Sequence, residues 1–362
     1  MKLGIIGLGA RMNSVLNLLL KAEPELAVVG LLDSNPAAAL ERVPEKDRAG
    51  VRVFDTVREM VEGVRPDALA IGTRCDSHAH FAIEAADCGL PLFLEKPVAT
   101  CMEDAIALEK AFLSNPCPVL VSFPLRASLV WEQAKKMVAA GTTGRVEHFL
   151  AVNYVPYGDV YFNGWYRDYK VTQGLFIQKA THDFDYLADL AGAPITRVAA
   201  MSSCGRVHRD LSQKPEPPDP DVLYFADIGS PETGMNEDSS SVLLEFSNGL
   251  KGVYTQVFFS KRGAKRGAVI SGVHGMVEFD FYPGEIRGTR HREPLNSTVA
   301  IEGKGAHFGG DTLLAENFLA MVRDGASSIA PLDAGLQSVY ACLAAKASAE
   351  NGQFVDVRQL RQ

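Results

Sequence analysis

The sequence predicts an α/β protein with a doubly wound parallel sheet followed by an α+β domain whose open sheet is large and mostly antiparallel. Three observations predict this fold. Apolar strand patterns alternate with helical patterns up to residue 123. β-rich segments follow residue 240, with a favoured hairpin turn at Asn248-Gly249. The length of 362 residues allows two domains, which we place at residues 1–123 and 124–362.

The chain begins with a pattern typical of a dinucleotide-binding unit. A β-rich run over residues 2–6 leads into Gly7-Leu8-Gly9, a helical pattern follows, and a second strand over residues 26–32 ends at Asp33. Gly7 allows a tight turn, and Gly9 lets backbone amides approach a pyrophosphate. The helix that follows presents the positive end of its dipole to the phosphates.

We expect the glycines and the first helical residues to contact the cofactor: Ala10, Arg11 and Met12. Met12 stands where a third glycine is usual, which implies a wider contact between helix and strand. Asp33 lies 24 residues after Gly9 and can accept hydrogen bonds from the adenosine ribose. Because a carboxylate repels a 2′-phosphate, Asp33 favours NAD over NADP.

The alternation of strands and helices continues to residue 123. Strands are predicted over residues 51–54, 68–72, 92–94 and 119–123, with helices at about 56–62, 79–88 and 102–113. Thr73 and His78 follow the strand at 68–72, where we expect the nicotinamide. For His78, capping the next helix or packing locally explains the residue equally well.

Glu95-Lys96-Pro97 ends the short apolar strand at 92–94, at the sheet edge where α/β proteins bind ligands. Pro97 keeps Lys96 out of helical geometry. Lys96 is therefore our candidate acid–base catalyst, and we expect Glu95 and Lys96 to lie beside the cofactor. A free lysine has a pKa near ~10.4 and is a poor base at neutral pH. A nicotinamide cation, partial burial and a second cation at Lys179 would lower the pKa of Lys96.

The second half opens with a predicted helix (128–140) and strand (146–154), followed by an aromatic-rich window at 154–169. Tyr154, Trp165 and Arg167 of this window are candidate carbohydrate contacts. A packed aromatic loop or a subunit contact is equally consistent with the pattern.

A helix predicted over residues 175–190 carries Gln178, Lys179 and His182, with His182 one turn beyond the other two. Lys179 and His182 are candidate catalysts and Gln178 a candidate substrate contact. Lys179 could instead pair with Asp183 at i, i+4.

Residues 202–238 are polar and rich in proline, which predicts a lid or an arm that reaches another subunit. Strands are then predicted over residues 241–246, 250–259, 268–271, 276–281 and 298–302, and closing helices over 311–323 and 334–350. His307 lies in a glycine-rich loop at 305–311, either as a substrate contact or as a solvated loop residue.

Composition excludes several classes of function. The net charge of −8 argues against binding to nucleic acid or to an anionic membrane. No apolar run reaches the ~20 residues of a membrane helix. The six scattered cysteines form no C-x-x-C pair and indicate reduced, cytoplasmic thiols. His182, Asp183 and Asp185 do not share one helix face, so we expect no metal site.

The combined pattern resembles the glucose–fructose oxidoreductase/inositol dehydrogenase (Gfo/Idh/MocA) family over nearly the whole chain. The matching features are G-L-G at 7–9, Asp33, the loop from Thr73 to His78, Glu95-Lys96-Pro97, V-S-F-x-x-R ending at Arg126, G-x-x-G at 272–275 and G-G-D at 309–311. The resemblance implies a Rossmann domain and a second domain whose open sheet forms a homodimer or homotetramer.

The resemblance also implies roles for individual residues. Lys96 would contact the nicotinamide ribose and the substrate, with a cis bond to Pro97, and Arg126 is a candidate substrate contact. His182 matches the histidine of the family's D-x-G-x-H motif, but Gln178 and Ala180 replace its aspartate and glycine.

The function we expect is NAD-dependent hydride transfer to or from a secondary alcohol or ketone of a sugar or polyol, with Lys96 and His182 as the proton-transferring pair. Two alternatives remain open. One is an NAD-dependent lyase or glycosidase that oxidises its sugar transiently. The other is a non-catalytic protein that senses NAD or a sugar.

Overall fold

The computed structural model describes residues 1–294, 296–302 and 306–357. The chain divides into two compact units, Met1–Ala127 with Gly309–Leu336, and Ser128–Phe308 with Gln337–Gln362. The segment 309–336 thus joins the first unit, whereas the expected division at 123/124 gave it to the second. Its helix α10 (Gly310–Asp324) packs against α1 (Ala10–Ala22), and Phe318 meets Phe93 edge-on, with ring centroids 5.6 Å apart.

The first unit contains the expected doubly wound parallel sheet. Its six strands run in the order β3-β2-β1-β4-β5-β6, and every neighbouring pair is parallel. These strands are β1 (Lys2–Ile6), β2 (Ala27–Leu32), β3 (Arg52–Val53), β4 (Ala68–Ile71), β5 (Leu92–Leu94) and β6 (Val119–Val121). The connecting helices include α4 (Val57–Val64), α5 (His78–Ala86) and α6 (Met102–Ser114). Strands β4, β5 and β6 are buried throughout, as expected for a parallel sheet covered on both faces.

The second unit is built on a nine-stranded sheet of order β16-β15-β14-β13-β7-β12-β11-β8-β17. Its pairs are antiparallel except that of β12 with β7, so the sheet is mostly antiparallel, as expected. The strands are β7 (Val146–Tyr154), β8 (Ile195–Ser203), β11 (Ser239–Phe246), β12 (Lys251–Val257), β13 (Lys265–Gly272), β14 (Gly275–Asp280), β15 (Glu285–Arg290), β16 (Asn296–Ala300) and β17 (Val355–Asp356). Strands β8, β15 and β17 were not predicted.

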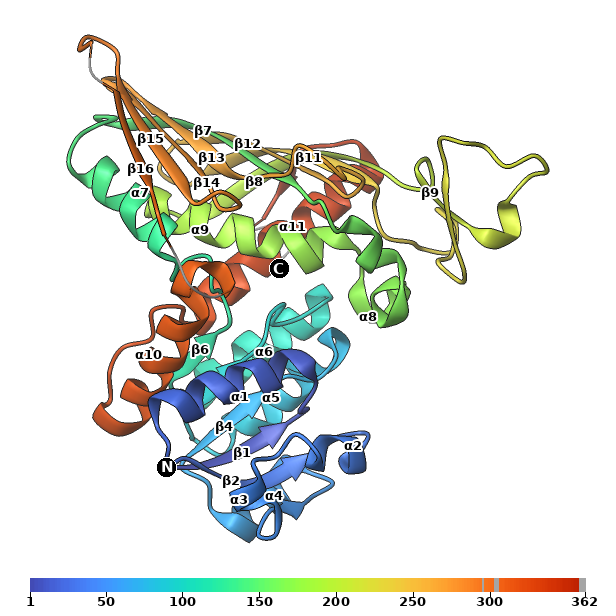
Figure 1. The fold of residues 1–362 in the computed structure, drawn as a ribbon, viewed down its shortest axis with the longest axis vertical. Coiled ribbons are helices and arrows are strands. Elements are labelled where there is room, and N and C mark those ends of the chain that lie inside the picture. Colours follow the sequence, from blue (N-terminus) through green and yellow to red (C-terminus); the bar gives the residue numbers. More distant parts are fainter. Residues whose placement is uncertain (295, 303–305, 358–362) are drawn as a thin grey trace. The chain divides into compact units, whose positions relative to one another are not determined.

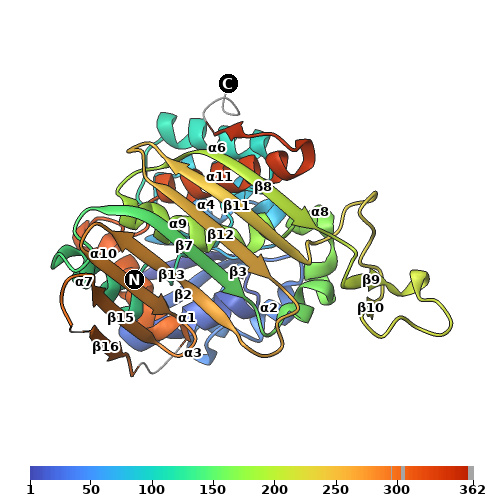
Figure 2. The same cartoon turned by 90° about the horizontal axis from the view of Figure 1, so that it is seen from above.

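Helices cover one face of this sheet. Figure 1 shows α7 (Leu129–Ala139), α9 (Thr181–Ala191) and the C-terminal part of α11 (Leu332–Asn351) on the same side of the strands. Figure 2 looks onto the opposite face, where no described element crosses the central strands. Alternate residues of β7 and β11 are buried on the helix side and exposed on the open side, which is the pattern of a sheet with one free face.

Two segments differ from simple expectation. The helix predicted over 175–190 begins as a π-helix at Phe176–Ala180 and becomes α-helical only from Thr181. The Pro-rich excursion contains a parallel pair, β9 (His208–Asp210) and β10 (Leu223–Phe225), which extends beyond the edge of the large sheet (Figures 1 and 2). Among the described residues, none of the helices has the length and apolarity needed to cross a membrane.

Candidate active site

The turn after β1 has the shape that a dinucleotide requires. Gly7 has φ +80°, and a Cβ on it would lie 2.6 Å from the backbone nitrogen of Thr73, so only glycine fits. A Cβ on Gly9 would meet nothing closer than the carbonyl oxygen of Gly72 at 4.0 Å, which leaves the backbone open to a ligand. Helix α1 starts immediately afterwards at Ala10, with Gly9 as its N-cap. Its free amides and dipole suit a pyrophosphate.

Met12 keeps the helix close to the sheet although it replaces the third glycine. Its side chain is 1% exposed, and a Cβ on Gly72 would lie 2.8 Å from the Cβ of Met12. Gly72, at the end of β4, therefore supplies the space that a glycine at position 12 would have given. The contact that we expected to widen is instead close.

Asp33 joins this turn to the end of β2. Its Oδ2 accepts a hydrogen bond from the backbone N–H of Leu8 at 2.8 Å, and its Oδ1 accepts one from the N–H of Asn35 at 2.8 Å. A carboxylate offers about four acceptor positions, so it retains capacity for two ribose hydroxyls. The turn, the helix start and Asp33 together fit a dinucleotide.

Lys96 lies two residues after the end of β5 and is half-buried, and the Lys96–Pro97 bond is cis. The carbonyl oxygen of Pro97 lies 2.8 Å from Nδ1 of His78, and that of Thr73 lies 3.2 Å from Nε2. His78 thus links the loop after β4 to the loop that carries Lys96, and local packing explains its place. Burial lowers the pKa of His78, although the hydrogen bond to the carbonyl of Pro97 opposes this effect.

Two further predicted residues lie in the first unit. The guanidinium of Arg11 contacts Glu95, Ser122 and Asp311, of which only Glu95 was expected near the site. Arg126 is half-buried and lies in the turns that follow β6.

In the second unit the π-helix carries the unusual pair Gln178-Lys179. Gln178 is 2% exposed, Lys179 7% and His182 8%. The Nζ of Lys179 lies 5.3 Å from the ring centroid of Tyr161 and 5.5 Å from that of Tyr157. Aromatic faces stabilise a partly desolvated ammonium by about 0.5–2 kcal/mol. π-Helical turns occur frequently at functional sites.

Glu237 supports the start of this helix and was not predicted from the sequence. Its carboxylate accepts a hydrogen bond from the backbone N–H of Leu175, and a Cβ on Gly174 would lie 2.8 Å from its Oε1. Burial raises the pKa of Glu237, although the amide of Leu175 and the charge of Lys346 oppose this.

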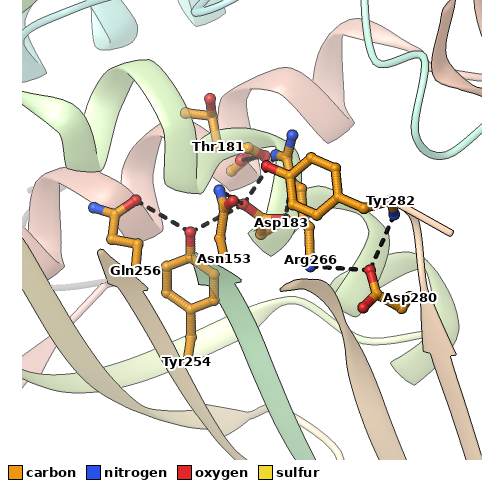
Figure 3. Close-up of polar contacts among 9 residues, drawn as sticks. Asn153, Thr181, Asp183, Tyr254, Gln256, Arg266, Asp280 and Tyr282 are labelled. Atoms are coloured by element: carbon orange, nitrogen blue, oxygen red, sulfur yellow. Dashed lines mark hydrogen bonds and ion pairs between the residues drawn. The ribbon is translucent and has the colours of Figure 1, made fainter. Parts of the chain in front are cut away.

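Asp183 anchors the same helix to the sheet (Figure 3). It is fully buried and receives two hydrogen bonds from Arg266, from Nε to Oδ1 and from Nη2 to Oδ2, both at 3.0 Å. The hydroxyl of Tyr254 and the amide of Asn153 also donate to Oδ2, at 2.9 and 3.2 Å. Asp183 therefore forms its ion pair with Arg266 of β13.

The remaining predicted residues lie in varied places. Tyr154 ends β7 and is paired with Val257 and Lys265. Trp165 and Arg167 lie in the 3₁₀ helix Gly164–Arg167, where Trp165 stacks on Tyr166 with ring centroids 3.8 Å apart and Arg167 forms an ion pair with Asp227 at 3.1 Å. His307 lies in the short 3₁₀ segment Ala306–Gly309 and has a non-helical φ of 52°. Gly305 of the predicted loop lies outside the described residues. The rings beside Lys179 are thus Tyr157 and Tyr161, which we had not singled out.

Two features bear on redox and metal chemistry. Within residues 1–294, 296–302 and 306–357, no group of three or more His, Cys, Asp or Glu side chains is arranged to hold a metal ion. The six cysteines form no disulfide.

Comparison with known proteins reveals relatives along most of the chain. A family model described as "Oxidoreductase family, NAD-binding Rossmann fold" matches residues 1–123, and one described as "GFO/IDH/MocA C-terminal domain" matches residues 131–278. The scyllo-inositol 2-dehydrogenase (NAD(+)) of Bacillus subtilis is 28% identical over 39% of this chain and 40% of its own length. A second relative from that species is matched over 46% of its length, so the chain spans less than half of these two proteins.

Two further similarities extend over more of the chain. The myo-inositol 2-dehydrogenase of Thermotoga maritima is 23% identical over 70% of this chain and 67% of its own. A levoglucosan dehydrogenase, solved with NADH and levoglucosan, has the same fold, with a TM-score of 0.80 over 99% of each chain at 20% identity. Because both family models match in chain order, this chain belongs to the Gfo/Idh/MocA family of oxidoreductases, with an NAD-binding Rossmann domain at its N-terminus.

Proposed function

We propose that this chain is an NAD-dependent dehydrogenase that transfers a hydride between the nicotinamide and a secondary alcohol or ketone of a sugar or polyol. The observation that carries the proposal is the placing of Lys96. It follows β5 at the carboxyl edge of the same parallel sheet whose β1–α1 turn fits a dinucleotide. Relatives named as inositol and levoglucosan dehydrogenases support the substrate class.

The protein's part in the reaction is proton transfer and orientation. NAD, when bound, supplies the hydride acceptor. In the oxidation direction, the neutral amine of Lys96 takes the proton of the substrate hydroxyl while the adjacent carbon gives up its hydride, so that a ketone forms. His182 acts as the partner that passes this proton on. The reverse direction uses the same groups, with Lys96 as the acid.

Lys179 and the remaining polar residues have supporting roles in this proposal. The ammonium of Lys179, held against Tyr157 and Tyr161, favours the neutral form of a nearby amine or imidazole. Gln178 is a neutral hydrogen-bonding group suited to sugar hydroxyls, and Arg126, Tyr154, Trp165, Arg167 and His307 are further candidates for contacts with substrate.

The cofactor preference follows from Asp33. Its carboxylate joins the end of β2 to the glycine turn, so a 2′-phosphate at the adenosine ribose would meet a negative charge. We therefore propose NAD rather than NADP as the working cofactor.

Turnover assays on Lys96 and His182 variants test the proposal. Wild type would be assayed with NAD and scyllo-inositol, myo-inositol and levoglucosan, the compounds named in the relatives, together with a wider panel of polyols. Lys96→Ala should lower kcat by about 10²–10⁴-fold, as removal of a general acid–base group does. His182→Ala should lower it less. Lys110→Ala, on the exposed face of α6, is the matched control and should leave kcat unchanged.

Undiminished turnover in Lys96→Ala would contradict the assigned role. Consumption of a sugar without net formation of NADH would favour a lyase or glycosidase. Tight NAD binding without turnover across the panel would favour a sensor.

We also propose that a second copy of this chain binds the open face of the nine-stranded sheet. Leu243, Val253, Leu150 and Val269 lie in one cross-strand row on β11, β12, β7 and β13. Leu150 is 45% exposed and Leu243 50%, so the row presents apolar side chains on the exposed face of the sheet. A contiguous apolar row of this kind is typical of a protein–protein interface.

A further inference from the structure

The side chain of Arg11 connects three elements of the first unit. Arg11 lies in the first turn of α1, directly after the glycine turn. Its Nε donates to Oε1 of Glu95 at 2.8 Å, and its Nη2 donates to Oγ of Ser122 at 2.9 Å and to Oδ1 of Asp311 at 2.6 Å. These partners follow β5, follow β6 and begin α10, respectively.

The partners are buried, which makes the linkage specific. Glu95 is 6% exposed, Ser122 1% and Asp311 6%. Arg11 and Glu95 form an ion pair between Nε and Oε1. A guanidinium can bridge three acceptors because its donors are spread over a rigid plane, whereas an ammonium is a compact point charge. The geometry therefore calls for arginine and not merely for a cation.

The linkage determines where Lys96 can lie. Glu95 precedes Lys96 directly, so fixing the Glu95 carboxylate against Arg11 fixes the strand end from which Lys96 projects. On the other side, Nδ1 of His78 contacts the carbonyl oxygen of Pro97 at 2.8 Å. The short segment 95–97 is thus held at its first and last residues by side chains from two different helices, Arg11 of α1 and His78 at the start of α5.

We propose that Arg11 is a positioning residue that couples the glycine turn to Lys96, and that it is not a ligand of the cofactor as its sequence position suggests. Through Arg11, the turn that fits the pyrophosphate and the strand end that carries the reactive amine form one rigid body. The inference rests on the proposed dehydrogenase function, and its readout is the separation of kcat from cofactor affinity.

Arg11→Met and Arg11→Lys, with Arg58→Met as the control, test the inference. Arg58 lies on α4 of the same unit with a side chain that is 75% exposed, so its loss should change neither kcat nor binding. Arg11→Met should lower kcat by about 10²-fold, since a displacement of about 1 Å in a reacting group costs that much. Its dissociation constant for NAD, measured by calorimetric titration, should stay within about threefold of wild type. Arg11→Lys should recover part of kcat, because it keeps the charge but not the three-way bridge.

The titration also reports folding, because only folded protein binds NAD with full stoichiometry. A weakened NAD affinity with unchanged kcat in Arg11→Met would overturn the inference and make Arg11 a cofactor ligand. Loss of stoichiometry in both Arg11 variants would also overturn it, since the residue would then serve folding alone. Wild-type protein that oxidises none of the panel would refute the proposed function and the inference with it. An active wild type beside an equally active Arg11→Met would refute the inference alone.

Discussion

Asp33 has a structural role and, in our proposal, also determines the selectivity for NAD. Its two oxygens already hold the backbone amides of Leu8 and Asn35, which orients the carboxylate at the end of β2. An amide at this position can accept a hydrogen bond through its oxygen but carries no charge. The structural part and the electrostatic part of the role can therefore be separated by one substitution.

Asp33→Asn should move the cofactor preference toward NADP. Removing the carboxylate removes repulsion of a 2′-phosphate, and about 1.4 kcal/mol of such repulsion corresponds to a tenfold change in the ratio of kcat/KM for NADP to that for NAD. Steady-state kinetics with both cofactors measure the ratio. Asp55→Asn, an exposed change in the same unit, should leave it unchanged. An unaltered ratio in Asp33→Asn would contradict the assigned role.

Whether a site residue could be predicted depended on how far apart in the sequence it and its partner lie. Gly7, Gly9 and Asp33 belong to one β-turn-α-β unit, so local spacing was enough to place them. Asp311 lies 300 residues from its partner Arg11, and Glu237 lies 62 residues from the amide of Leu175. No local pattern connects such pairs, because they meet only when distant segments pack together.

At the scale of elements, the helix that carries His182 is held by charge as well as by apolar packing. The buried pair of Asp183 and Arg266 ties the start of α9 to β13, and Tyr254 and Asn153 add ties to β12 and β7. Burying two charges is costly, and such a pair is retained where a specific geometry is needed. The pair specifies how α9 lies on the sheet. The sequence could predict the helix but not the π-helical start, because an i→i+5 turn has no distinct residue pattern.

Asp183→Asn should lower the free energy of unfolding by about 3–5 kcal/mol, because it leaves the guanidinium of Arg266 buried without a counter-charge. Arg266→Met combined with Asp183→Asn should recover part of that loss. Urea denaturation measures both. Glu132→Gln, which breaks the exposed pair with Lys136, is the control and should cost no more than about 0.5 kcal/mol. Equal effects of the buried and exposed changes would contradict this account.

Asp238 binds the chain where the Pro-rich excursion begins, at residues 206–208, and its side chain is 1% exposed. Nδ1 of His208 lies 2.7 Å from Oδ1 of Asp238, and the backbone amides of Arg206, Val207 and His208 donate to the same carboxylate. Burial raises the pKa of Asp238, but the combined lowering effect of these hydrogen bonds is larger. The pKa of Asp238 therefore lies below its ordinary value.

The stabilisation by Asp238 should therefore depend on pH in one direction. It is fully present above the unfolded pKa of about 4 and is lost as the pH falls through the lower folded pKa. Asp238→Asn should be less stable than wild type by about 1–3 kcal/mol at pH 7, because buried amide donors lose a charged acceptor. The difference should shrink below about pH 4. Denaturant unfolding across this range measures it, and a difference that grows on acidification would contradict the assignment.

At the scale of the whole molecule, the topology of the second unit leaves one face of the nine-stranded sheet uncovered by helices. Buried and exposed residues alternate along β7 and β11, and the paired registers align Leu150 with Val253 and Val253 with Leu243. Registers depend on strand order, which the sequence alone did not provide, because β8 and β15 were missed. The apolar row was therefore visible only in the folded sheet.

Leu150→Lys combined with Leu243→Lys should convert the proposed dimer to a monomer. Two charges in the centre of an apolar interface would each be desolvated without a partner. Size-exclusion chromatography with light scattering gives the mass. Leu113→Lys, at a position 77% exposed in the first unit, is the control and should leave the mass unchanged. A wild-type protein with the mass of a monomer would contradict the proposed dimer.

The direct test of the central claim, hydride transfer between nicotinamide and a secondary alcohol, is to follow the hydrogen itself. A polyol found active in the panel, with deuterium on its reactive carbon, would be incubated with NAD and the products analysed by mass spectrometry. We predict one deuterium in each NADH formed, together with an equal amount of ketone, and formation of both about 10²–10⁴-fold slower in Lys96→Ala. Conversion of the substrate with no deuterated NADH, or with the deuterium returned to a cleaved sugar, would contradict the account.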